Sequence, residues 1–142
     1  AEEDAERNTD LIDLRMDAVR IECRVRRHKY LSEYGGEFTI RTERPSGNKT
    51  ELAKIIEGWG DYIFYGFSDS GEVSLERWIL GDLKVFRLWC MRRLCMNKGE
   101  LPGKQCINPD NSSLFRAFKV KDLPDGFIQA RSSIVKEIPR TA

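Results

Sequence analysis

The sequence predicts an α/β or α+β fold in which a mixed central sheet is flanked by helices. Its 142 residues suffice for one hydrophobic core, so we expect residues 1–142 to form a single domain. Short β-prone runs alternate along the chain with two segments in which apolar residues recur at helical spacing. The composition, 40% hydrophobic and 33% charged, is that of a folded globular protein rather than a disordered one.

The N-terminal part of the chain predicts a short helix and three strands. Residues 1–8 are good helix formers, and Leu11–Leu14 has the composition of a brief strand. A turn then leads into the strand Val19–Val25, which we expect to pair with Leu11–Leu14 as an antiparallel hairpin. Glu37–Thr42 also alternates between apolar and polar residues and predicts a third strand.

Two helices follow, each with a recognisable start. Thr50 is a good N-cap for a helix of about two turns that ends at Gly58. Asp82 is a good N-cap for a longer amphipathic helix that ends near Leu94. Both helices carry an apolar stripe that would pack against the sheet.

The remaining strands come from the second half of the chain. Residues 62–67 are apolar on both faces, which predicts a central strand covered on each side. Residues 73–80, 114–120 and 126–132 predict three further strands. Because residues 97–113 are rich in Gly, Pro, Asn and Ser, we expect a long irregular loop there.

The strand Val19–Val25 is the most informative part of the sequence for function. Its period of two places four apolar residues on one face, Val19, Ile21, Cys23 and Val25. The other face carries Arg20, Glu22, Arg24 and Arg26. We expect the apolar face to join the core and the charged face to form a working surface.

Two acidic residues on adjacent strands predict a metal site. Asp13 lies on the first strand of the predicted hairpin and Glu22 on the second, so the hairpin would bring their carboxylates together. Mg²⁺ prefers oxygen ligands, polarises a phosphodiester and lowers the pKa of its bound water. Such a hairpin would suit a shared Mg²⁺ ion, and the reaction there would be phosphodiester hydrolysis.

An acid on one strand, followed by Glu22-x-Arg24 on the next, resembles the PD-(D/E)xK nuclease superfamily. Small phage-type nucleases are similar at the positions that follow, Gly36, Phe38, Gly58, Trp59, Asp61 and Tyr62. The resemblance implies a restriction-endonuclease-like core and Mg²⁺ as cofactor, held by Asp13 and Glu22. We therefore expect a DNA endonuclease or a junction-cleaving enzyme in which Arg24 holds the scissile phosphate.

Arg24 departs from the family pattern, which has a lysine that helps to activate water. A guanidinium stays protonated and does not readily exchange protons with water. The alternative is therefore a catalytically inactive module on the same scaffold that binds nucleic acid or protein, as a viral accessory protein would.

A second set of acids competes with this site. Asp61, followed by Asp82 and Lys84, also forms an acid and a D-x-K triplet, with Glu51 or Glu57 on the preceding helix. Because Asp82 is already explained as a helix N-cap, the first site is favoured.

Basic residues flank the favoured site. Lys and Arg number 24 against 23 Asp and Glu, so a nucleic-acid surface has to be local. We expect phosphate contacts from Arg26, Arg27, Lys29, Arg41, Arg44 and Lys49. Tyr30, Tyr34 and Trp59 are close in sequence and would add stacking on bases.

The cysteines and the hydropathy predict the cellular setting. The four cysteines, with His28, have poor spacing for zinc, and we expect them to be reduced thiols. No apolar run approaches the roughly 20 residues that cross a bilayer. We therefore expect a cytoplasmic protein with no membrane partner, either monomeric or a homodimer.

Overall fold

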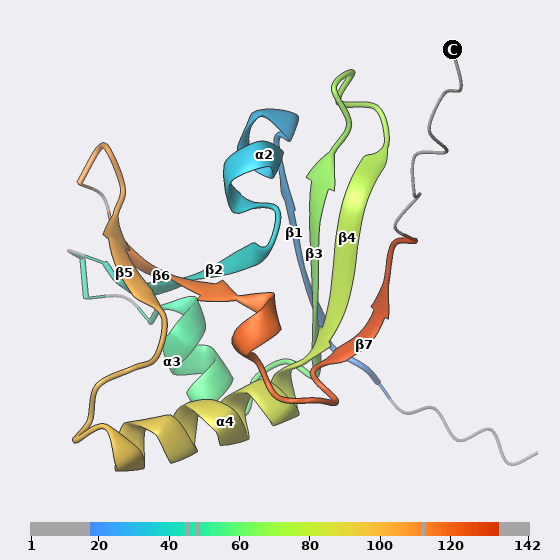
Figure 1. Ribbon diagram of the computed structural model, residues 1–142. Coiled ribbons are helices and arrows are strands. Elements are labelled where there is room, and N and C mark those ends of the chain that lie inside the picture. The colour runs from blue at the N-terminus through green and yellow to red at the C-terminus, as the bar shows by residue number, and fades with distance from the viewer. Residues whose placement is uncertain (1–17, 45, 48, 112, 134–142) are drawn as a thin grey trace, which may run out of the picture.

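The computed structural model describes residues 18–44, 46–47, 49–111 and 113–133. This part of the chain has an α+β fold with two sheets and a few helices (Figure 1). In chain order the elements are β1 Ile21–Arg26, the 3-10 helix His28–Tyr30, α2 Leu31–Tyr34, β2 Glu37–Glu43, α3 Glu51–Ile56, β3 Tyr62–Ser68, β4 Leu75–Asp82, α4 Leu83–Met96, β5 Lys104–Ile107, β6 Leu114–Lys119, the 3-10 helix Val120–Asp122 and β7 Ile128–Arg131.

The four-stranded sheet has the order β1-β3-β4-β7 and the three-stranded sheet has the order β2-β6-β5. In the first sheet β1 is parallel to β3, and the other pairs are antiparallel. β3 is a central strand as predicted, because it lies between β1 and β4, and it buries Ile63, Tyr65 and Phe67 on one face. The predicted cover on both faces is not seen, since Phe64 on the other face is only partly buried.

The segment 97–113 is not irregular throughout, contrary to the prediction. It contains β5, which pairs with β6 at the edge of the three-stranded sheet. β5 has only four residues, and apolar and polar residues alternate weakly along it, so the sequence gives almost no sign of a strand there. Its pairing with β6 therefore had to be seen in the structure.

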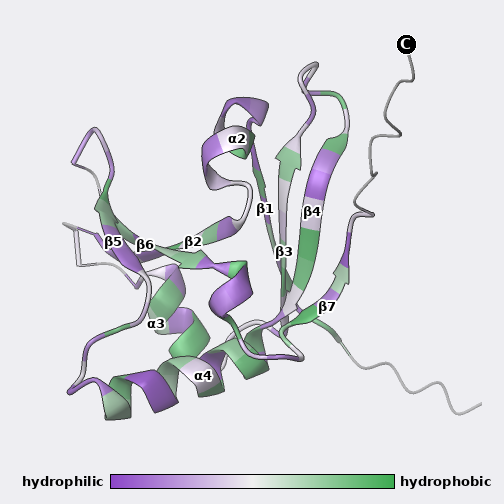
Figure 2. Cartoon of the chain, in the orientation of Figure 1, coloured by the Kyte–Doolittle hydropathy of each residue, from purple (hydrophilic) through white to green (hydrophobic). Residues whose placement is uncertain are grey.

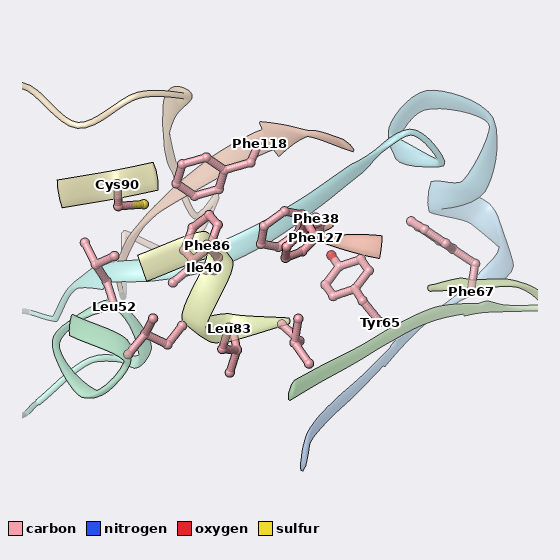
Figure 3. Packing of buried hydrophobic residues seen from close by; sticks show 12 residues of the cluster. Phe38, Ile40, Leu52, Tyr65, Phe67, Leu83, Phe86, Cys90, Phe118 and Phe127 are labelled. Atoms are coloured by element: carbon pink, nitrogen blue, oxygen red, sulfur yellow. The ribbon is translucent and has the colours of Figure 1, made fainter. Parts of the chain in front are cut away.

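The core lies between the four-stranded sheet and the layer formed by the other sheet with α3 and α4 (Figure 1). Four phenylalanines are grouped at its centre (Figure 3). Phe38 stacks on Phe118 and Phe127 at ring-centroid distances of 5.4 and 5.5 Å. Phe86 meets Phe38 edge-on at 5.4 Å. Offset and edge-on contacts of this kind add stability beyond the burial of apolar area.

Both predicted helix starts are confirmed. Thr50 Oγ1 accepts a hydrogen bond from a backbone N–H of the first turn of α3, and Gly58 beyond its end has a φ of 94°. Asp82 Oδ1 accepts the backbone N–H of Lys84 at 2.8 Å at the start of α4. Apolar and polar residues intermix along α4 (Figure 2), and its buried residues are Leu83, Phe86 and Cys90. Within the described ranges, no helix is both long and apolar enough to cross a membrane.

The orientation of β1 is the reverse of the predicted one. Ile21, Cys23 and Val25 are exposed, whereas the residues between them, including Glu22 and Arg24, are partly buried. The parallel register places Glu22, Arg24 and Arg26 beside the core residues Ile63, Tyr65 and Phe67 of β3. Residues that pair on adjacent strands have their side chains on the same face of the sheet. Pairing with β3 therefore turns the charged side of β1 toward the core.

Gly81 in β4 leaves room for the ring of Phe127, since an added Cβ would lie 2.3 Å from it. We expect Gly81→Ala to lower the free energy of unfolding by about 1–3 kcal/mol, as overpacking of a core does. Urea denaturation measures this change. Gly36→Ala is the control, because nothing lies within 4 Å of its added Cβ. Equal losses in the two variants would contradict the prediction.

Candidate functional site

The inner side of β1 brings charged residues into the space between the two sheets. Glu22, Arg24 and Arg26 alternate with exposed apolar residues and are each partly buried. Arg24 reaches β2 in the opposite sheet. Charged side chains in such a place need partners or a ligand, because burial without either is unfavourable.

Arg24 joins the two sheets. Its Nη1 donates to the carbonyl oxygen of Thr39 at 2.9 Å and to its hydroxyl at 3.4 Å. Its Nη2 forms an ion pair with Glu51, the first residue of α3. Burial lowers the pKa of Arg24, while the nearby Tyr65 and Glu22 raise it. Because a guanidinium remains protonated in proteins, Arg24 is a fixed positive charge beside Glu22.

Glu51 and Thr39 continue this network on the β2 side. Glu51 Oε2 accepts the backbone N–H of Arg41 at 2.9 Å, so one carboxylate binds both β2 and β1. The Tyr65 hydroxyl lies 3.2 Å from Thr39 Oγ1. Neither Thr39 nor Tyr65 was predicted as a site residue from the sequence. The signal available was a threonine between the buried Phe38 and Ile40.

Glu22 differs from Arg24 in its surroundings. Its side chain makes no hydrogen bond or ion pair with any residue in the described ranges, although its charge acts on Arg24. Asp13, its predicted partner, and the predicted strand Leu11–Leu14 lie outside the described residues. Among the residues that are described, no three His, Cys, Asp or Glu side chains are grouped to hold a metal.

The acids of the competing site, Asp61, Asp82, Glu51 and Glu57, all make contacts that stabilise the fold. Asp61 Oδ2 accepts the backbone N–H of Arg20 at 2.8 Å. Asp82 accepts backbone N–H groups at the start of α4, and Glu57 pairs with Lys49. Glu51 is engaged with Arg24. These carboxylates therefore have partners within the fold.

A cation–aromatic group, formed by Arg26, Lys29, Tyr30 and Tyr34, lies at the end of β1. The Arg26 guanidinium is 4.4 Å from the ring centroid of Tyr30 and 5.3 Å from that of Tyr34. Lys29 Nζ lies 4.9 Å from the Tyr30 centroid. Such contacts hold the cations in place while their charges remain available to an anion.

The other predicted phosphate contacts have different environments. Arg27 pairs with Glu72 at 3.7 Å and Lys49 with Glu57 at 2.8 Å. These ion pairs are exposed and therefore weak. Arg44 is half-buried at the turn after β2. The structure thus brings two of the predicted basic residues together with aromatic rings and pairs two others with carboxylates.

A separate pocket of about 350 Å³ opens between α4 and the three-stranded sheet. Its lining residues are Trp89, Arg93, Asn97, Pro102, Gly103, Phe118, Lys119 and Asp122. It shares no residue with the network around Arg24. The cavity and the charged strand are therefore distinct features of the molecule.

The pair between Arg24 and Glu51 has side chains that are 29% and 18% exposed. We expect Glu51→Gln to lower the free energy of unfolding by about 1–3 kcal/mol, because Arg24 loses its counter-charge. Combining it with Arg24→Met should cost less than the sum of the single changes. Urea denaturation of all four proteins gives the coupling.

The pair between Lys49 and Glu57 is the control, since its side chains are 65% and 42% exposed. The same double-mutant cycle there should give a coupling below about 1 kcal/mol. A coupling at Arg24 and Glu51 no larger than this would contradict the buried role of that pair.

Comparison with known proteins identifies no relative. No protein-family model, no curated protein and no solved structure matches this chain.

Proposed function

We propose that the chain is a Mg²⁺-dependent DNA endonuclease or junction-cleaving enzyme. Its PD-(D/E)xK-like site would lie on a restriction-endonuclease-like core. The residues that support this are Glu22, the network that fixes Arg24, and the cation–aromatic group. Glu22, Arg24 and Arg26 lie on β1, and the other members of the cation–aromatic group lie on the 3-10 helix and α2 that follow it.

The orientation of Glu22 carries the proposal. β1 directs this residue inward, where it is partly buried and has no hydrogen bond or ion pair with a described residue. A carboxylate in such a place is unfavourable unless a cation compensates it. Arg24 is close, but two of its nitrogens already contact Thr39 and Glu51. The arrangement favours a further positive ligand at Glu22.

Each residue then has a defined task. Glu22 and Asp13 would hold Mg²⁺, which when bound polarises the phosphodiester and lowers the pKa of its water. Arg24 has five N–H donors, of which the contacts to Thr39 and Glu51 leave some for the scissile phosphate. Arg26 and Lys29 would contact the neighbouring phosphates, with stacking on Tyr30 and Tyr34.

Incubation with duplex, branched and single-stranded DNA in the presence of Mg²⁺ or Mn²⁺ tests this activity. We expect cleavage, and we expect Glu22→Gln to slow it. Loss of a residue that only contacts a metal ligand lowers activity by roughly 10–100-fold, so loss of a ligand itself should lower the rate at least as much. Glu100→Gln, on the exposed turn after α4, is the matched control. Absence of cleavage on every substrate, or an equal rate in Glu22→Gln, would refute the enzyme.

A second candidate function is a nucleic-acid-binding or protein-interaction module without catalysis. The observation that favours it is the complete structural role of Arg24, which binds Glu51 and Thr39 at the position of the family's lysine. Such a module would retain the cation–aromatic group and dispense with proton transfer. DNA binding that survives Asp13→Asn combined with Glu22→Gln, without cleavage, would support it.

Both candidates require the basic residues at the end of β1. We expect Arg26→Ala combined with Lys29→Ala to weaken DNA binding and to reduce the salt dependence, log Kd against log salt, by about two ion equivalents. Fluorescence anisotropy at several salt concentrations measures this slope. Arg92→Ala on the exposed side of α4 is the control. An unchanged slope in the double variant would exclude this surface.

A further inference from the structure

The face of the four-stranded sheet that points away from the core is apolar. We call it the outer face, and it comprises Ile21, Cys23 and Val25 of β1, Phe64 and Gly66 of β3, and Leu75, Trp78 and Leu80 of β4. In Figure 1 the other sheet and α3 lie to the left of these strands, and α4 runs below their lower ends. Val25 is 53% exposed, Ile21 50% and Leu75 42%.

The outer face is continuous from strand to strand. Cys23 lies beside Phe64, and Val25 lies beside Gly66 in the parallel register. Phe64 stacks on Trp78 at 5.5 Å between ring centroids. A Cβ built on Gly66 would contact Leu75 and Trp78 at 3.4 Å each, so side chains of β4 cover the gap at the glycine.

The charges around the outer face are paired within the chain. At one end Arg20 pairs with Asp61 at 3.6 Å. At the other end Arg27 pairs with Glu72 at 3.7 Å, and His28 Nδ1 lies 2.9 Å from the carboxylate of Glu76. The outer face itself contains no charged residue. It is therefore complementary to an apolar, uncharged surface and not to nucleic acid.

The size of the outer face indicates how tightly such a surface is bound. Six residues of strand span about 20 Å and three strands about 14 Å, which gives a footprint on the order of 300 Å². Apolar patches of this size on soluble proteins are often functional. Because stable dimers bury roughly 800 Å² per partner, the complex would be weak and reversible.

We propose that the partner is a second copy of this chain, packed outer face to outer face around a twofold axis. A uniformly apolar surface whose bordering charges are already paired is complementary to itself, which a twofold interface requires. The two sheets would lie about 10 Å apart, as in a β-sandwich. Glu22 and Arg24 point inward and are not part of the outer face, so the dimer is independent of the proposed nuclease activity.

Two exposed cysteines provide a built-in test. Cys23 lies in the outer face and Cys95 lies on α4, whereas Cys90 is buried and its pKa is raised to about 12. Labelling by iodoacetamide, followed by peptide mass spectrometry, gives the rate at each thiol over a wide range of protein concentration. As the protein concentration rises, we expect the labelling rate of Cys23 relative to that of Cys95 to fall several-fold. Over the same range, sedimentation should show the molecular mass doubling.

Val25→Lys, next to Gly66 and Leu75, should abolish both the mass increase and the protection of Cys23. The matched control is Met96→Lys, at an apolar side chain on α4 that is 74% exposed. Circular dichroism and urea denaturation verify that both variants are folded. Because Val25 is itself exposed, its replacement by lysine leaves the core intact.

Three outcomes would overturn the proposal. Protection of Cys23 at every concentration would mean that a segment of the same chain, such as residues 1–17, covers the outer face. Equal reactivity of Cys23 and Cys95 at every concentration, with a monomeric mass, would mean that nothing covers it. A dimer in which Cys23 stays reactive would use another surface.

Discussion

The arrangement of the molecule depends on the Arg24 guanidinium. This one group contacts the backbone and side chain of Thr39 in the second sheet and the carboxylate of Glu51 in α3. Glu51 in turn binds the backbone of β2, so three elements meet at one partly buried cation. A charge at this depth is tolerated only with such partners. Its position fixes the side of β1 that faces the core.

The inward orientation of the charged residues of β1 determines both surfaces of its sheet. On the inner side, Ile63, Tyr65 and Phe67 of β3 supply the apolar contacts that a charged strand lacks. On the outer side, the apolar residues of β1 join those of β3 and β4 instead of entering the core. The proposed chemistry and the proposed association therefore concern opposite faces of one strand.

The features of the fold that depend on neighbouring residues could be predicted from the sequence. Thr50, Asp82 and the apolar run of β3 act within a few residues, and their roles were recognisable. Alternation in β1 defined two faces but not which one is buried, because that depends on the register with β3. For the site, the shared face of Glu22 and Arg24 was predictable. Tyr65 meets Thr39 across 26 positions, and no local pattern encodes such a contact.

Phe127 adds a consequence for how the chain is made. Its ring stacks on Phe38 from β2 and occupies the space left by Gly81, yet it comes from the turn just before the last described strand. During synthesis the aromatic centre therefore stays incomplete until nearly all of the described chain has emerged from the ribosome. Meanwhile the apolar strands are open to nonspecific association. Late closure of the core thus lengthens the time during which these strands are exposed.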